Sequence, residues 1–265
     1  MSNPVHPSIS PSRRDFLARA GAGWLALSSL GREAIGEDET EKPLKIAAIV
    51  TEFRFRSHAH VILENFLAPY LFNGKRVDPN FEIVSLYLDQ TPEEDMGRAV
   101  AKEYGIPVFP SIAQALRVGG PTLGVDAVLS IGEHGEYPVN AKGQREYPRK
   151  RFFDEIVKVF RDSDRVVPVF NDKHLSYRWD WAREMYDTAE QMKIPLMAGS
   201  SVPLAERRPT LEIPAGSKIV EAVSIHGGPV ESYDFHGLEV LQSMLEARKG
   251  GETGVSEVQF LEGDA

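Results

Sequence analysis

Apolar and polar positions follow two kinds of spacing along most of the chain, and this spacing predicts strands that alternate with helices. Short apolar runs rich in β-branched residues predict strands, and apolar positions three and four residues apart predict helices. Strands are predicted over 45–50, 81–89, 106–110, 125–132, 166–173 and 194–201. Helices are predicted over 57–72, 91–105, 111–120, 151–164 and 179–193. This alternation indicates βαβ units, so we predict an α/β fold with a parallel sheet and helices on both faces.

Local signals refine two of these helices and the segment between them. Ser57 is placed to cap the helix 57–72. Thr91 followed by Pro92 predicts the start of the helix 91–105, and Gly105 predicts its end. The polar segment NGKRVDPN, 73–80, is predicted as a loop.

The pattern changes after residue 203, which predicts a second part of the chain. KIVEAVSIHGG, 218–228, and GVSEVQFLEGDA, 254–265, are predicted as strands, with a helix that starts near 232–236. About sixty residues are too few for a finished domain. We therefore predict a Rossmann-like domain over 45–203 and the start of a smaller α+β domain over 204–265.

Composition excludes several classes of site. The chain has 265 residues, 42% of them hydrophobic and 26% charged, which is typical of globular proteins. It has no cysteine, which excludes disulfides, thiolate catalysis and cysteine-based metal sites. A formal charge of −9 and a pI of about 5.4 argue against nucleic acid as the main partner.

The N-terminal segment predicts export. SRRDFLARAGAGWLALSSL, 12–30, has the paired Arg13 and Arg14 before Phe16-Leu17 and a short apolar stretch, and this resembles a twin-arginine signal. We predict a signal peptide over 1–36 and a charged linker over 37–44. The chain would then engage the twin-arginine machinery, which exports folded proteins, and reach a periplasmic or other extracytoplasmic location.

Ligands of such sheets lie at the carboxyl ends of the strands, which defines the candidate site residues. The turn after the first strand, Thr51 to His58, contains no glycine, and its Arg54 and Arg56 are interpreted either as an anion site or as solvated arginines. Asp89 ends the second strand, where it either binds a ribose hydroxyl or closes a turn. His58 and His60 are two residues apart on a helix and point different ways, so no metal site is predicted.

Four segments, in this order, resemble the Gfo/Idh/MocA family, whose namesakes include glucose–fructose oxidoreductase and inositol dehydrogenase. They are AKEYGIPVFPSIAQAL (101–116), VDAVLSIGEHGEYP (125–138), NDKHLSYRWDWAREMYDTAEQMKIPLM (171–197) and YDFHGLEVLQ (233–242). The resemblance implies a Rossmann domain that binds NAD or NADP, followed by an α+β domain that shapes a site for sugars, polyols or their derivatives. Some relatives use bound NAD in a redox-neutral way to cleave glycosidic bonds.

The resemblance also implies roles for particular residues. Lys173 stands where the family writes E-K-P, and His236 begins the family's H-x-x-D pattern; both are expected to be catalytic. The alternative for Lys173 is a structural ion pair with Asp172 or Glu133, and the alternative for His236 is a helix cap or a pair with Glu239. The cofactor-binding set is expected at the strand ends: Thr51, Arg54, Arg56, Ser57, His58, Asp89, Gly132, Glu133 and His134. The chain departs from the family where the G-x-G-x-x-G turn should be and at Ser232, where the family has an acid.

Three functions follow from these observations. The first is an exported oxidoreductase that uses NAD(P) on a sugar or polyol derivative. The second is a redox-neutral, NAD-using glycan hydrolase or lyase. The third is a non-catalytic Rossmann-like binding protein for an anion or a sugar acid. A homo-oligomer is compatible with all three. Tyr177, Trp179 and Trp181 are interpreted as sugar-stacking or, with more weight, as core residues.

Overall fold

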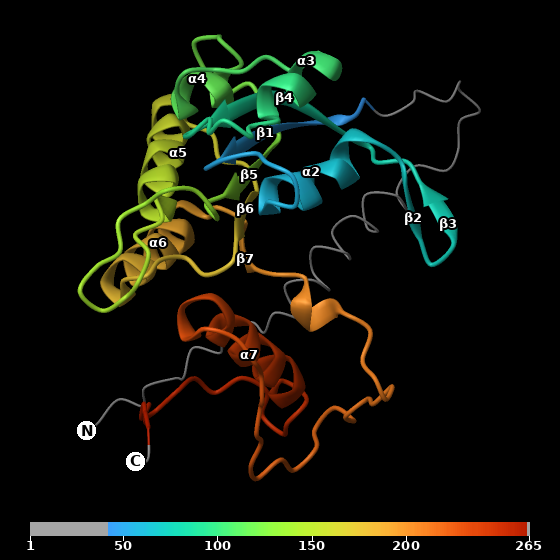
Figure 1. Ribbon diagram of the computed structural model, residues 1–265, viewed down its shortest axis with the longest axis vertical. Helices are drawn as coiled ribbons and strands as arrows, with labels where there is room; N and C mark the ends of the chain where they lie inside the picture. Colours follow the sequence, from blue (N-terminus) through green and yellow to red (C-terminus); the bar gives the residue numbers. More distant parts are fainter. Residues whose placement is uncertain (1–41, 264–265) are drawn as a thin grey trace, which may run out of the picture. The chain divides into compact units, whose positions relative to one another are not determined.

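The computed structural model describes residues 42–263, and the predicted signal peptide therefore lies outside the described residues. These residues form two compact units, 42–204 with 226–239, and 205–225 with 240–263. The first unit is built on a five-stranded sheet in which all neighbours are parallel, in the order β4-β1-β5-β6-β7 (Figure 1). The strands are β1 (Leu44–Val50), β4 (Phe81–Leu88), β5 (Ala127–Ile131), β6 (Val169–Asp172) and β7 (Leu196–Gly199).

A short segment next to β4 completes the sheet. The predicted strand 106–110 is reduced to one parallel bridge between Val108 and Leu86. The Leu86 N–H donates to the Pro107 carbonyl at 3.0 Å, and the Phe109 N–H donates to the Leu86 carbonyl at 2.9 Å. With this segment at the edge, the strand positions read 3-2-1-4-5-6, the order of the Rossmann fold, with the switch point between β1 and β5.

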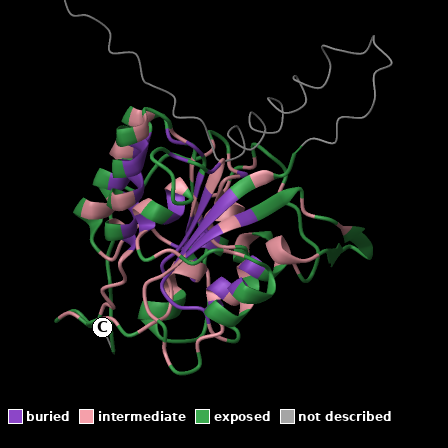
Figure 2. Cartoon of the chain, turned by 90° about the horizontal axis from the view of Figure 1, so that it is seen from above, coloured by how far each residue is buried: buried purple, intermediate pink, exposed green. Residues whose placement is uncertain are grey.

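Helices cover both faces of the sheet and enclose two apolar cores. α2 (His58–Leu67) and α3 (Gly97–Glu103) pack with Ile46, Ala48 and Val50 of β1. α4 (Ile112–Arg117), α5 (Arg149–Ser163) and α6 (Trp179–Met192) pack with Ala47 and Ile49 on the other face. Both faces of β1 are thus covered, and Figure 2 shows the central strands as buried. The α/β fold predicted from the sequence is confirmed.

The predicted helix 57–72 is wrong beyond α2. Residues Tyr70–Phe72 form β2 and Lys75–Val77 form β3, an antiparallel hairpin in the segment that was expected to be helix end and loop. Asn73 and Gly74 join the two strands with φ values of 49° and 74°. An Asn-Gly pair with both residues at positive φ is the preferred two-residue hairpin turn, so the correct signal was in the sequence.

The predicted start of the helix 91–105 is also wrong, because α3 begins at Gly97. The Asp95 N–H closes a turn on the Pro92 carbonyl, and the Met96 N–H donates to the Phe53 carbonyl at 2.8 Å. A Cβ on Gly97 would lie 3.0 Å from the Phe53 Cβ and 2.9 Å from a Leu88 methyl. Residues 91–96 therefore cover the turn after β1, and this tertiary packing overrides the local capping signal.

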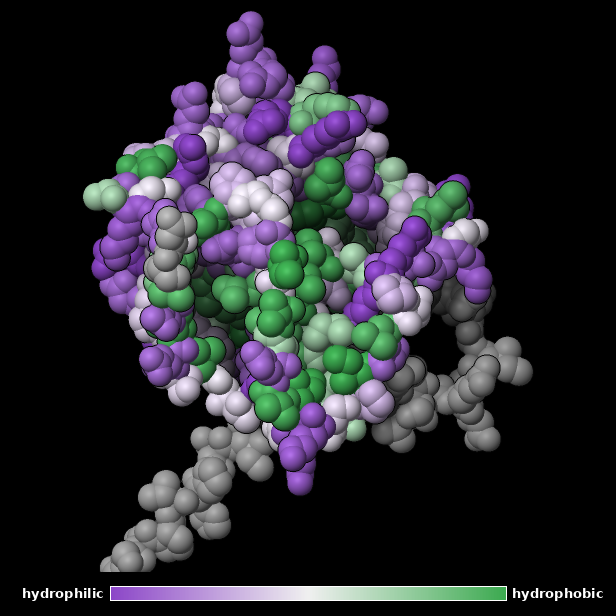
Figure 3. All heavy atoms as spheres, turned by 60° about the horizontal axis from the view of Figure 1, so that its bottom comes forward, coloured by the Kyte–Doolittle hydropathy of each residue, from purple (hydrophilic) through white to green (hydrophobic). Residues whose placement is uncertain are grey.

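The second unit does not form the strands predicted over 218–228 and 254–265; residues 264 and 265 lie outside the described residues. Within the unit, Ser217 pairs with Arg248 in a single bridge. Apolar side chains of the two segments are exposed among the described residues: Val220 is 87% exposed and Ile225 93%. Figure 3 shows hydrophobic side chains gathered at the surface on one face.

Two further elements complete the description. A 3₁₀ turn spans Val202–Leu204, and the predicted helix near 232–236 is observed as α7 (Val230–Leu245). None of the described helices is long and apolar enough to cross a membrane.

Candidate functional site

The turn after β1 is closed on the hydroxyl of Ser57. Ser57 caps α2 as predicted, and its Oγ accepts from the N–H groups of His60 at 3.3 Å and Arg54 at 3.2 Å. The Ser57 N–H donates to the Arg54 carbonyl at 3.0 Å, and the Arg56 N–H donates to the His60 Nδ1 at 3.1 Å. Four backbone donors of this turn are thus satisfied within the chain.

The two arginines of the turn do not converge on one point. The Arg54 Nε donates to the Glu52 Oε1 at 2.5 Å, and Glu52 is buried. Arg56 has a φ of 62°, and its guanidinium lies 5.2 Å from the ring centroid of the exposed Phe55. The anion-binding role of these arginines stays a prediction.

The switch point between β1 and β5 is bridged by side chains. The Thr51 hydroxyl donates to the Glu133 carbonyl at 2.5 Å. The His58 Nδ1 lies 2.6 Å from the Asp172 Oδ2, and the His58 ring makes an edge contact with His134, 5.0 Å between centroids. Burial and the neighbouring His58 lower the pKa of His134. The predicted residues Thr51, His58, Glu133 and His134 therefore lie close together, and their cofactor-binding role stays a prediction.

Asp89 is held by three donors at the end of β4. Its Oδ1 accepts from the Tyr87 hydroxyl at 2.7 Å and from Arg151 at 2.6 Å, and its Oδ2 accepts from the Tyr137 hydroxyl at 2.7 Å. Burial disfavours the carboxylate, but these hydrogen bonds outweigh it and lower the pKa of Asp89. The carboxylate expected to bind a ribose is thus engaged by its own chain.

A buried ion cluster occupies the ends of β5 and β6. The guanidinium of Arg149, whose side chain is 1% exposed, is paired with Glu133 and lies 3.2 Å from the His174 Nε2. It also lies 4.9 Å from the centre of the Tyr147 ring. Burial, helped by the charges of Arg149 and Lys173, lowers the pKa of His174 to about 3, so this imidazole is neutral.

Gly132 gives Arg149 the room it needs. A Cβ at this position would lie 2.7 Å from the Arg149 Cγ. The predicted Gly132 is therefore explained by a close approach of a side chain to the backbone.

Lys173 follows β6 in a left-handed backbone conformation, with a φ of 67°. The buried side-chain amide of Asn171 fixes this turn, because it donates to the carbonyls of residues 172, 173 and 174 at 3.1–3.3 Å. The Lys173 side chain is 9% exposed, and its ammonium lies 3.7 Å from the Glu133 Oε1. Among the described residues, Glu133 is its one carboxylate partner within 4.0 Å.

His236 lies in a third cluster, beyond the end of β7. The buried carboxylate of Glu239 accepts from the Ser200 N–H at 3.0 Å and from the Ser200 hydroxyl at 2.5 Å. The His236 Nδ1 lies 3.2 Å from the Ser200 Oγ and 3.4 Å from Glu239. The Phe235 ring contacts both His174 and His236, with centroids 5.3 and 5.6 Å apart, which connects this cluster to the ion cluster.

Sequence reasoning missed Arg149, Arg151 and Ser200. Arg149 is the first of three consecutive basic residues, and no local pattern separates the buried one from its exposed neighbours. Ser200 stands in a predicted strand end, where a serine is unremarkable. These residues acquire their importance from partners 16 to 62 positions away.

No protein-family model and no curated protein matches this sequence. Solved structures, however, are similar to the chain. A Gfo/Idh/MocA family oxidoreductase from Vibrio cholerae is 20% identical, with a TM-score of 0.40 over 60% of this chain. UDP-N-acetylglucosamine 3-dehydrogenase from Acidithiobacillus ferrooxidans is 14% identical, with a TM-score of 0.39 over 59% of this chain. Biliverdin reductase in complex with biliverdin and NADP+ from Synechocystis sp. PCC 6803 is 13% identical, with a TM-score of 0.37 over 61% of this chain.

The matched region spans 38–39% of these three proteins. Two of them are oxidoreductases or dehydrogenases by name, and the Vibrio cholerae protein belongs to the family that the four sequence segments resemble. The fold assignment itself rests on the parallel pairing and the strand order described above. Activity, cofactor and substrate are therefore matters of proposal.

Proposed function

We propose that the protein binds an oxygen-rich small molecule, a sugar, polyol or sugar acid, through Lys173 at the carboxyl edge of its sheet. The observation that carries this proposal is the environment of the Lys173 ammonium. The Lys173 side chain is 9% exposed, and its carboxylate partner lies 3.7 Å from the ammonium, beyond hydrogen-bond distance. An ammonium group has three donors, and Glu133 holds none of them at hydrogen-bond distance. A ligand oxygen would accept a hydrogen bond from this group.

The ion cluster offers two cations to an electron-rich ligand. Arg149 and Lys173 are both paired with Glu133, and Asp172, whose carboxylate also bonds His58, interacts with Arg149 as well. The cluster is rigid, because Asn171 fixes the turn of Lys173 and Arg149 is enclosed on all sides. A hydroxyl or a carboxylate of the ligand would thus meet a preorganised positive group.

A nicotinamide dinucleotide does not fit this edge in the standard Rossmann pose. The pyrophosphate of such a cofactor lies against glycines and free N–H groups at the start of the first helix. Here side chains replace the glycines, and Ser57 and His60 accept from the N–H groups of Arg54, Arg56 and His60. The carboxylate of Asp89 is engaged by three donors, and His58 with Asp172 bridges the switch point. We derive no hydride-transfer step for this reason.

Calorimetric titration tests the proposal. We would titrate myo-inositol, glucose, gluconate and glucuronate into the parent protein, Lys173→Met and the matched control Lys102→Met, whose lysine is exposed on α3. We expect a ligand that binds the parent and Lys102→Met equally and binds Lys173→Met at least tenfold more weakly. Equal binding by a folded Lys173→Met would overturn the proposal.

A second candidate is an NAD(P)-dependent oxidoreductase of the Gfo/Idh/MocA type acting on a sugar or polyol derivative. The complete 3-2-1-4-5-6 strand order favours it, as does the place of Lys173 directly after β6. The names of the similar solved structures point the same way. NAD or NADP released on denaturation, or bound in calorimetry, with a net change in NAD(P)H in the presence of a sugar, would establish it. Absence of binding at millimolar nucleotide would leave the first proposal.

Export by the twin-arginine route is a separate proposal. It is supported by the paired arginines of the N-terminal segment, which lies outside the described residues. Cell fractionation should find the parent chain outside the cytoplasm and a chain with Arg13→Lys and Arg14→Lys inside it. Equal distribution of the two chains would refute this route.

A further inference from the structure

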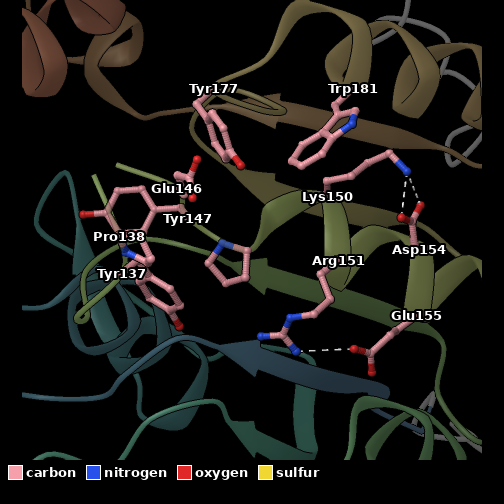
Figure 4. A pocket seen from close by; sticks show the side chains of 11 residues that line it. Tyr137, Pro138, Glu146, Tyr147, Lys150, Arg151, Asp154, Glu155, Tyr177 and Trp181 are labelled. Atoms are coloured by element: carbon pink, nitrogen blue, oxygen red, sulfur yellow. Dashed lines mark hydrogen bonds and ion pairs between the residues drawn. The ribbon is translucent and has the colours of Figure 1, made fainter. Parts of the chain in front are cut away.

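A groove lined by aromatic side chains lies beside the ion cluster and shares Tyr147 with it. It lies between the loop 137–148, α5 and α6, and has a volume of about 560 Å³ (Figure 4). Tyr137, Tyr147, Tyr177 and Trp181 contribute rings to it, as Figure 4 shows. A second hollow of about 970 Å³ shares Glu146, Tyr177 and Trp181 with the first. The two hollows therefore form one extended groove, which we call the aromatic groove.

The aromatic rings of this groove are not core residues, contrary to the interpretation favoured from the sequence. Trp179, which lines the second hollow, is 80% exposed. Tyr177 and Trp181 are half-buried and meet edge to face, with centroids 5.5 Å apart. Single exposed rings are common at protein surfaces, but a cluster of indole and phenol rings offers a recognition surface.

The wall of the groove formed by the loop is held in place by its own amides. The Asn140 Nδ2 donates to the Gln144 Oε1 at 3.0 Å, and the Asn140 Oδ1 accepts from the N–H groups of Lys142 at 2.9 Å and Gln144 at 3.1 Å. The Gln144 Nε2 donates to the Tyr177 carbonyl at 3.2 Å, which ties the loop to the start of α6. The groove is thus preformed, which lowers the entropic cost of binding.

The charges that line the aromatic groove cancel. Four cations and four anions line the two hollows together: Lys142, Lys150, Arg151, Arg178, Glu146, Asp154, Glu155 and Asp180. Three of the cations are paired inside the groove: Lys150 with Asp154 at 2.6 Å, Arg151 with Glu155 at 3.3 Å, and Arg178 with Asp180. A ligand of high charge gains little from such a lining, whereas a ligand with many hydroxyl groups finds paired donors and acceptors at the rim.

We propose that the aromatic groove binds a neutral oligosaccharide. The apolar faces of sugar rings would lie on Trp179, Trp181 and Tyr177, and the ring hydroxyls would bond the amides and ion pairs beside them. The volumes of the two hollows, about 560 and 970 Å³, suit a chain of several sugar units rather than a single ring. This site is distinct from Lys173 and does not depend on the function proposed for it.

The test uses neutral oligosaccharides of known linkage. We would titrate hexamers of β-1,4-linked glucose, α-1,4-linked glucose and β-1,4-linked xylose into the full chain, with a galacturonate hexamer for comparison. Binding would be followed by calorimetry and by tryptophan fluorescence. Trp179→Ala removes an exposed ring, so the fold should persist, and Phe72→Ala, which removes a 63% exposed ring on β2, is the matched control.

We expect at least one neutral hexamer to bind the parent and Phe72→Ala equally and Trp179→Ala at least tenfold more weakly. A lack of binding by all three neutral hexamers would overturn the proposal. So would binding that Trp179→Ala leaves unchanged but Lys173→Met abolishes, since the sugar would then occupy the strand edge. Self-association of the parent that Trp179→Ala alone disrupts, without sugar binding, would show instead that the groove meets a second copy of the chain.

Discussion

The buried pair of Arg149 and Glu133 gives the sharpest test of the structure. Glu133→Gln keeps the size of the side chain and removes its charge. The Arg149 guanidinium, 1% exposed, would then lose its ion-pair partner and keep the neutral His174, the face of Tyr147 and the weaker attraction of the Asp172 carboxylate. Lys173 would lose its carboxylate partner as well. Removal of one member of a buried ion pair costs about 3–5 kcal/mol, because it leaves an uncompensated charge in the protein interior.

Thermal and urea unfolding followed by circular dichroism measure this cost. At roughly 2–4 °C per kcal/mol for a chain of this size, the melting temperature should fall by about 6–20 °C. Glu155→Gln is the control, because it breaks the half-exposed pair with Arg151 and should cost no more than about 1 kcal/mol.

The double variant Glu133→Gln with Arg149→Met tests whether the lost stability comes from the uncompensated charge of Arg149. It removes that charge and fills the same space with an apolar side chain, so it should be more stable than Glu133→Gln alone. The reasoning is refuted if Glu133→Gln stays within about 1 kcal/mol of the parent, or if the double variant is no more stable than the single one.

Three further predictions concern the same region. Gly132→Ala should lower the free energy of unfolding by about 1–3 kcal/mol, because the new Cβ would lie 2.7 Å from the Arg149 side chain. The control is Gly227→Ala, whose Cβ would have no atom within 4 Å and which should change stability little. Equal urea midpoints for the two variants would contradict this prediction. Because the pKa of His174 is depressed to about 3 in the folded state, the unfolded chain binds the proton first, and stability should fall from about pH 6.5 towards pH 3 by up to about 1.4 kcal/mol per pH unit. His174→Gln should flatten this slope between pH 6 and 4 in urea titrations, and an unchanged slope would speak against a buried neutral imidazole. Ser57→Ala should cost about 1–2 kcal/mol, since two backbone donors lose their acceptor, and an unaltered melting temperature would contradict the closed turn.

The elements that were predicted best are those whose pattern is set by their own burial. α5 and α6 each have one apolar face, and β1 is apolar from Ile46 to Val50 because both of its faces are covered there. Elements whose form depends on a distant neighbour were predicted less well. Residues 91–96 were predicted as the start of a helix but pack over Phe53. Residues 218–225 were predicted as a strand but form none among the described residues.

The candidate site shows the same division. The strand ends were located from the order of the elements, and Thr51, His58, Glu133 and His134 do lie together. Nothing local distinguishes Arg149 from Lys150 or Arg151, although only Arg149 is buried. For Tyr177, Trp179 and Trp181 the sequence left sugar stacking as the less favoured interpretation, because a stripe of rings with helical spacing is more often part of the core.

The sequence by itself determined the alternation of strands and helices, the parallel sheet and the edge at which a ligand site should lie. The reason is that the spacing of apolar residues within each element reflects which of its faces is buried. Only the tertiary structure decided which side chains fill that edge. Hydrogen bonds and ion pairs between residues such as His58 and Asp172 join positions 114 apart, and no local pattern records them. The tertiary structure likewise decided that Trp179 faces solvent, because exposure depends on what the fold places beside a helix rather than on the helix itself.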